Sequence, residues 1–124
     1  MKRLISILGS TGSIGLSTLK ILDLKKSHFK PYLFSADKNY KLICKQINKY
    51  RPEIFLINNK TVYEKAKKKF RNHKIKIIKA LETKHLKKTS DITVLAIPGI
   101  EGLSPTILMI KKSKKMLLAN KESI

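Results

Sequence analysis

The sequence has a single cysteine, no tryptophan and few acidic residues. With Cys44 alone, the chain can form no internal disulfide and no metal site built from several cysteines. No stretch approaches the roughly 18 consecutive apolar residues of a membrane-spanning helix, and no apolar segment ahead of a cleavage site marks an export signal. We therefore expect a cytoplasmic protein without a membrane partner.

The length and the pattern of apolar residues indicate one α/β domain, residues 1–124. Short apolar runs alternate with amphipathic segments, which predicts a mostly parallel sheet with helices on both faces, a doubly wound, Rossmann-type fold. The first expected helix places Ile14, Thr18, Ile21 and Leu22 on one face, its apolar face, with Leu19 beside them. The expected strands cover residues 4–8, 32–34, 53–57, 75–78, 92–96 and 115–119, and the expected helices cover residues 13–24, 39–49, 61–70, 82–88 and 103–112.

The charge of the chain is strongly one-sided. Eight acidic residues stand against 28 basic ones, which gives a net charge of +20 and points to nucleic acid or another polyanion as a partner. Arginine, whose guanidinium suits nucleic-acid recognition, supplies only Arg3, Arg51 and Arg71, and the lysines are spread over the whole chain. This distribution favours a solvated lysine surface, and a basic module that binds nucleic acid is kept as the alternative function.

Three of the five glycines follow the first expected strand at regular spacing, as Gly9, Gly12 and Gly15. An apolar strand that leads through such a loop into a helix is typical of a phosphate cradle, because the glycines allow a tight turn and a close approach of backbone amides to an anion. The helix start adds unpaired N–H groups and the positive end of its dipole. The loop is therefore expected to bind the phosphates of a dinucleotide.

The loop after the second expected strand, residues 35–39, does not decide between NAD and NADP as the cofactor. Asp37 suits the ribose hydroxyls of NAD, whereas Lys38 and Asn39 suit the extra phosphate of NADP. Asn39 is also a good cap for the helix that follows.

Four segments together resemble the amino-terminal domain of the 1-deoxy-D-xylulose 5-phosphate reductoisomerase family: residues 7–15, 36–39, 99–106 and 118–123. The resemblance runs along the whole chain in the right order. It implies NADPH as the cofactor and a phosphosugar as the substrate. The family rearranges 1-deoxyxylulose 5-phosphate and reduces it to 2-C-methylerythritol 4-phosphate, in the non-mevalonate route to isoprenoids.

The resemblance also implies roles for single residues. The pyrophosphate would lie on residues 11–14, the ribose phosphate on Lys38 and Asn39, the nicotinamide half on Asn120 and Glu122, and the substrate on Lys121. Glycine usually stands in the family where this chain has Asp37. The expected cofactor-binding set is Gly9, Ser10, Thr11, Gly12, Ser13, Ile14, Gly15, Asp37, Lys38, Asn39, Asn120 and Glu122.

In the family, the metal-binding carboxylates, the residues that bind the substrate phosphate and the mobile lid all lie beyond the position of Ile124. We therefore expect no metal ligand in this chain, and Mg²⁺ or Mn²⁺ only together with a downstream domain. A homodimer is likewise expected only through those regions. Because those groups would stabilise the transition state, the chain alone is expected to bind cofactor without turnover.

Overall fold

A single parallel sheet forms the centre of the molecule. The structure, a computed structural model, describes residues 2–97 and 103–118. The sheet has six strands in the order β4-β3-β2-β1-β5-β6, and every neighbouring pair is parallel. The strands are β1 (Arg3–Leu8), β2 (Phe29–Ala36), β3 (Ile54–Ile57), β4 (Lys76–Ile78), β5 (Ser90–Leu95) and β6 (Ser113–Leu118).

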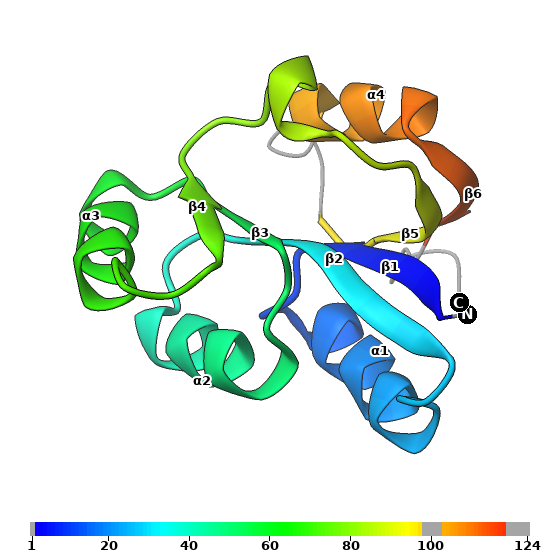
Figure 1. Ribbon diagram of the computed structural model, residues 1–124, viewed down its shortest axis with the longest axis horizontal. Helices are drawn as coiled ribbons and strands as arrows, with labels where there is room; N and C mark the ends of the chain where they lie inside the picture. The colour runs from blue at the N-terminus through cyan, green and yellow to red at the C-terminus, as the bar shows by residue number, and fades with distance from the viewer. Residues whose placement is uncertain (1, 98–102, 119–124) are drawn as a thin grey trace.

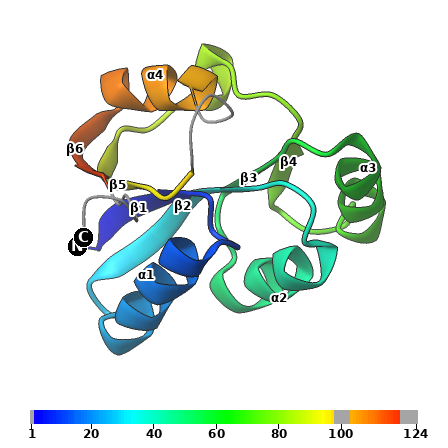
Figure 2. The same ribbon diagram turned by 180° about the vertical axis from the view of Figure 1, so that it is seen from behind.

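Helices cover both faces of the sheet (Figures 1 and 2). On one face lie α1 (Ser13–Leu24), α2 (Tyr40–Tyr50) and α3 (Lys60–Lys69), and on the other lie α4 (Leu103–Lys111) and the short 3-10 helix η1 (Thr83–His85). This arrangement confirms the predicted doubly wound α/β fold. Within the described residues, no helix is long and apolar enough to cross a membrane.

Each face of the sheet has its own hydrophobic core. Under α1, α2 and α3, Phe34 and Phe55 are fully buried and meet edge to face, with ring centroids 6.0 Å apart. Under α4 and η1, the core gathers around Leu33, Leu56 and Met109. Burying one such side chain contributes about 1.5–3 kcal/mol, so β1, β2 and β3, which are covered on both faces, anchor the domain. Cys44 is buried in the first core, as expected of a small apolar residue.

The strand order reverses between β1 and β5. From β1 the chain moves outward through β2 and β3 to β4, and it then returns to the other side of β1 as β5. The carboxyl ends of these central strands therefore meet at one edge of the sheet, where doubly wound folds bind their ligands. Residues 9–12 leave β1 at this point and lead into α1.

Three local predictions differ from the structure. The second strand is longer than residues 32–34, because all of β1 pairs with it, with one irregularity between Ile5 and Ser6. The helix expected over 82–88 is only the 3-10 turn η1. After η1 the Lys88 amide donates to the Tyr32 hydroxyl at 3.1 Å, and Lys88 Nζ donates to Glu53 at 2.9 Å. These contacts fix the residues between η1 and β5 in a non-helical connection.

The third difference concerns α1. Ile21, expected inward, is 59% exposed, because α1 packs through Gly15, Leu19 and Leu22.

Candidate cofactor-binding site

The three glycines of the loop after β1 have three different surroundings. Gly9 has φ +91°, and a Cβ there would lie 2.7 Å from the Ala96 carbonyl oxygen. A Cβ on Gly15 would lie 2.1 Å from the Gly9 carbonyl oxygen. Among the described residues, a Cβ on Gly12 would touch only that same oxygen, at 3.8 Å. Gly9 and Gly15 therefore shape the loop, while the space in front of Gly12 is open as far as the described part of the chain is concerned.

The start of α1 offers free backbone amides beside this open space. Gly12 is the N-cap, and no side chain caps the helix. Its carbonyl accepts from the Leu16 amide at 2.8 Å, whereas the amides of Thr11, Ser13 and Ile14 have no acceptor among the described residues. No acidic side chain occupies the first turn. An anion at this point would gain several hydrogen bonds and the positive end of the helix dipole.

A buried polar network holds the loop in place. The amides of Gly9 and Ser10 both donate to the Ser35 carbonyl oxygen, at 3.1 and 2.8 Å, and the Gly9 amide also reaches the Ser35 Oγ at 2.9 Å. The Ser10 side chain is fully buried and turned toward α2, where it hydrogen-bonds Gln46. Ser10, predicted to bind the cofactor, thus has its hydroxyl inside the protein. Ser35, at the start of the predicted cofactor loop 35–39, and Gln46, which belongs to no motif, both support the glycine loop, and no spacing in the sequence indicated this role. Both side chains are buried.

The loop after β2 brings three predicted residues to the same edge of the sheet. Asp37, Lys38 and Asn39 are all exposed. Asn39 is the N-cap of α2, and its Oδ1 accepts from the Leu42 amide at 3.2 Å. The cap uses the oxygen of the side chain, and the amide nitrogen still has hydrogens to donate. The capping prediction is therefore confirmed, while the choice between NAD and NADP stays a prediction.

Some predicted residues lie outside the described part of the chain. They are Asn120, Lys121 and Glu122, together with the residues 98–102 after β5. Within the described residues, no group of three or more histidine, cysteine, aspartate or glutamate residues could hold a metal ion. The described part of the site can therefore hold and orient an anionic dinucleotide, and it offers no acid–base pair for chemistry.

The chain matches known proteins over nearly its full length. The family model for 1-deoxy-D-xylulose 5-phosphate reductoisomerase matches residues 5–124. The reductoisomerase of Porphyromonas gingivalis is 39% identical over 127 residues, which cover 100% of this chain and 33% of that protein. That of Buchnera aphidicola subsp. Schizaphis graminum is 39% identical over 125 residues, which cover 97% and 31%.

Solved structures of the same family are also similar. The reductoisomerase of Zymomonas mobilis in complex with NADPH superposes with a TM-score of 0.83 at 28% identity, over 99% of this chain and 33% of that one. A reductoisomerase in complex with NADPH, fosmidomycin and magnesium gives a TM-score of 0.82 at 26% identity, over 98% and 31%. The chain spans about a third of the length of the curated relatives that it matches. On these matches, the chain belongs to the 1-deoxy-D-xylulose 5-phosphate reductoisomerase family.

Proposed function

We propose that the 124 residues form one cofactor-binding domain that holds NADPH for a reductoisomerase. The observation that carries this proposal is the contrast between the glycines. Gly9 and Gly15 are closed in by backbone, while Gly12 meets little of the described chain and lies beside amides of α1 that have no acceptor among the described residues. A pyrophosphate needs this kind of close backbone approach.

The rest of the cofactor is assigned along the same edge of the sheet. Thr11, Ser13 and Ile14 would donate their amides to the pyrophosphate. Two side chains would bind the 2′-phosphate of the adenosine ribose. Lys38 would attract it with its positive charge, and the side-chain amide nitrogen of Asn39 would donate a hydrogen bond to it. Asn120 and Glu122 would contact the nicotinamide half, and Lys121 the substrate. NADPH supplies the hydride of the reduction when it is bound.

For the whole protein we propose the activity of the family. It rearranges 1-deoxyxylulose 5-phosphate and reduces the product with NADPH to 2-C-methylerythritol 4-phosphate, in isoprenoid synthesis. The divalent cation, Mg²⁺ or Mn²⁺, would be held by carboxylates of the family's downstream domain. A cytoplasmic location and a homodimer formed through those downstream regions complete this proposal.

The test is a calorimetric titration of the purified chain with NADPH and then with NADH, at about 0.15 M ionic strength, where attraction between distant charges is largely screened. Saturable binding that prefers NADPH supports the proposal. Gly12→Ala is the matched variant, since its Cβ enters the proposed phosphate position and meets little of the protein. If neither nucleotide binds to a chain shown to be folded, the proposal is wrong.

The alternative, a lysine surface for nucleic acid, makes a different forecast. The affinity for a polyanion that binds through counterion release falls steeply as the salt concentration rises and depends little on the shape of the ligand. The same titration with a single-stranded oligonucleotide distinguishes the two functions. The domain is also expected not to turn over the phosphosugar, and NADPH-dependent reduction by the purified chain would contradict that expectation.

A further inference from the structure

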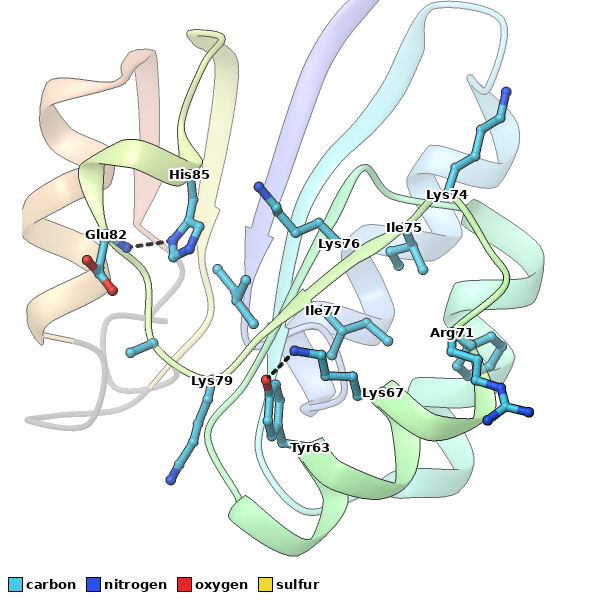
Figure 3. Close-up of a pocket in the computed structure, with 13 residues that line it drawn as sticks. Tyr63, Lys67, Arg71, Lys74, Ile75, Lys76, Ile77, Lys79, Glu82 and His85 are labelled. Atoms are coloured by element: carbon cyan, nitrogen blue, oxygen red, sulfur yellow. Dashed lines mark hydrogen bonds between the residues drawn. The ribbon is translucent and has the colours of Figure 1, made fainter.

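A groove lies along the outer edge of the sheet, at β4, which β2 and β3 separate from β1 and its glycine loop. It has a volume of about 770 Å³ and is bordered by α3, β4 and η1 (Figure 3). Its floor includes Ile75 and Ile77. The charged side chains that line it are Lys67, Arg71, Lys74, Lys76, Lys79 and Glu82.

The backbone of β4 has a free side at this groove. In the described part of the chain, β4 is the last strand of the sheet and pairs only with β3. The Lys76 amide donates to the Glu53 carbonyl oxygen at 3.0 Å, so Lys76 turns its backbone groups toward β3. In a parallel ladder the next residue points the other way, which directs the N–H and C=O of Ile77 outward. An edge of this kind is a template for one more strand.

Positive charge lines both faces of this edge. Ile77 packs in the core under α3, and because side chains alternate along a strand, Lys76 faces the opposite side. Lys74 comes shortly before β4 and lines the same groove. Lys67 of α3 lines the groove on its other side, and Arg71, which follows α3, lies at its rim with the guanidinium turned away from β4 (Figure 3). Lys74 and Lys76 form one basic row of the groove, and Lys67 and Arg71 form the other. None of these four cations forms an ion pair with the described residues.

The remaining polar contacts of the groove do not neutralise it. Glu82 lies 3.9 Å from Lys84, and its own backbone amide donates to His85 Nδ1 at 3.0 Å. Lys67 donates to the Tyr63 hydroxyl at 3.0 Å, which leaves its charge in place. The groove therefore keeps a large excess of positive charge.

We propose that the free edge of β4 binds an acidic, extended peptide segment of a partner protein as an added strand. The edge supplies the N–H and the C=O of Ile77, a donor and an acceptor that another peptide backbone matches and a phosphate chain does not. The two basic rows select carboxylates on either face of the added strand. A second copy of this chain is disfavoured, because both copies would bring a net charge of +20. The lysines thus disfavour pairing of the edge with a second copy of this chain and favour pairing with an acidic strand.

The probe is a labelled octapeptide that alternates glutamate with threonine, titrated into the 124-residue chain at about 0.15 M ionic strength. Its control is the same peptide with alternate backbone nitrogens methylated, which keeps the charge and removes strand pairing. Binding is followed by fluorescence anisotropy, and hydrogen exchange at the Ile77 amide reports where the peptide lies. We expect the unmodified peptide to bind and to slow that exchange.

Two charge-reversed variants test the basic rows separately. Lys74→Glu/Lys76→Glu and Lys67→Glu/Arg71→Glu should each weaken peptide binding on the order of tenfold. The matched control, Lys20→Glu/Lys25→Glu, reverses two exposed lysines at α1 and should change it less than about threefold. Thermal unfolding checks that every variant is folded.

Three results would overturn the proposal. The first is equal binding of the methylated peptide, which would mean attraction by charge alone. The second is an equal loss of affinity in the α1 control, which would mean a diffuse polyanion surface. The third is no binding at this ionic strength, which would leave the lysines of the edge only a protective role.

Discussion

Gln46 and Ser10 exchange two hydrogen bonds across 36 positions of the chain. The Ser10 hydroxyl donates to Gln46 Oε1 at 2.6 Å, and Gln46 Nε2 donates to the Ser10 carbonyl oxygen at 2.9 Å. Both residues are buried, so neither bond can be replaced by water without a rearrangement. Through this pair, α2 fixes the shape of the loop that is proposed to hold the pyrophosphate.

Replacing Gln46 should therefore damage both stability and cofactor binding. Gln46→Leu fills a similar volume but leaves the Ser10 carbonyl oxygen and hydroxyl without this partner, which costs about 1–3 kcal/mol. Urea unfolding measures the loss of stability, and calorimetry measures a weaker affinity for NADPH in the fraction that remains folded. The exposed neighbour Asn48→Leu is the control and should change neither quantity by much. An unchanged affinity in a folded Gln46→Leu chain would show that α2 does not position the loop.

The glycines should separate binding from folding. Gly12 has φ −80° and ψ 174°, which any residue adopts, so Gly12→Ala should leave the free energy of unfolding within about 1 kcal/mol of its original value. The same substitution should weaken NADPH binding tenfold or more, on the order of 1.4 kcal/mol. Gly15→Ala should instead destabilise the fold by about 1–3 kcal/mol or more, because its Cβ would lie 2.1 Å from the Gly9 carbonyl oxygen.

These two variants are measured side by side by thermal unfolding and by NADPH titration. If Gly12→Ala unfolds the chain, the open space at that position does not exist. If it folds and binds NADPH with unchanged affinity, the cofactor does not approach the loop there.

The pH dependence of stability should include a contribution from Asp91. The Leu4 amide donates to Asp91 Oδ2 at 2.7 Å, and this hydrogen bond lowers the pKa of the carboxyl, with further help from Lys114. A carboxyl whose pKa is lower in the folded state than its ordinary 3.8 stabilises the fold above that value and loses the effect as the pH falls through the folded pKa. Asp91→Asn should therefore lower stability at neutral pH and flatten the acid limb of the stability curve.

Urea unfolding of both chains from neutral pH down to about pH 2.5 measures this difference. Glu64→Gln, which removes an exposed carboxylate on α3, is the control for the loss of one negative charge. Parallel curves for the original chain and Asp91→Asn would mean that the hydrogen bond with Leu4 does not lower the pKa enough to matter.

The sequence predicted the order of the elements well because each strand is a short apolar run between polar segments. It also placed the glycine loop correctly between β1 and α1, since an apolar run before the three glycines and an amphipathic segment after them predict a strand, a turn and a helix in succession. Ile21 was misplaced because residues 14, 18, 21 and 22 form a plausible helix face, and only the packing of Gly15 and Leu19 against the sheet decides which face turns inward. Gln46 could not be predicted, because its partner Ser10 meets it only once α2 packs beside the loop that follows β1.

Cofactor selectivity should depend on the three exposed residues after β2. Lys38→Met removes the charge proposed to meet the 2′-phosphate and should weaken NADPH binding with little effect on NADH, since only NADPH carries that phosphate. Asp37→Asn removes a negative charge from the same loop and should strengthen NADPH binding relative to NADH.

Substitutions of Asn39 test the proposal most directly, because its side-chain oxygen caps α2 while its side-chain nitrogen is proposed to bind the 2′-phosphate. Asn39→Asp keeps an oxygen that caps α2 at the Leu42 amide, so the free energy of unfolding should stay within about 0.5 kcal/mol. The same variant loses the donor proposed for the 2′-phosphate and adds a like charge, so NADPH affinity should fall while NADH affinity changes little. Asn39→Ala should instead cost about 1 kcal/mol of stability by removing the cap. Calorimetry with both nucleotides and urea unfolding give the two quantities. An Asn39→Asp chain that binds NADPH as before would restrict Asn39 to its role as a cap.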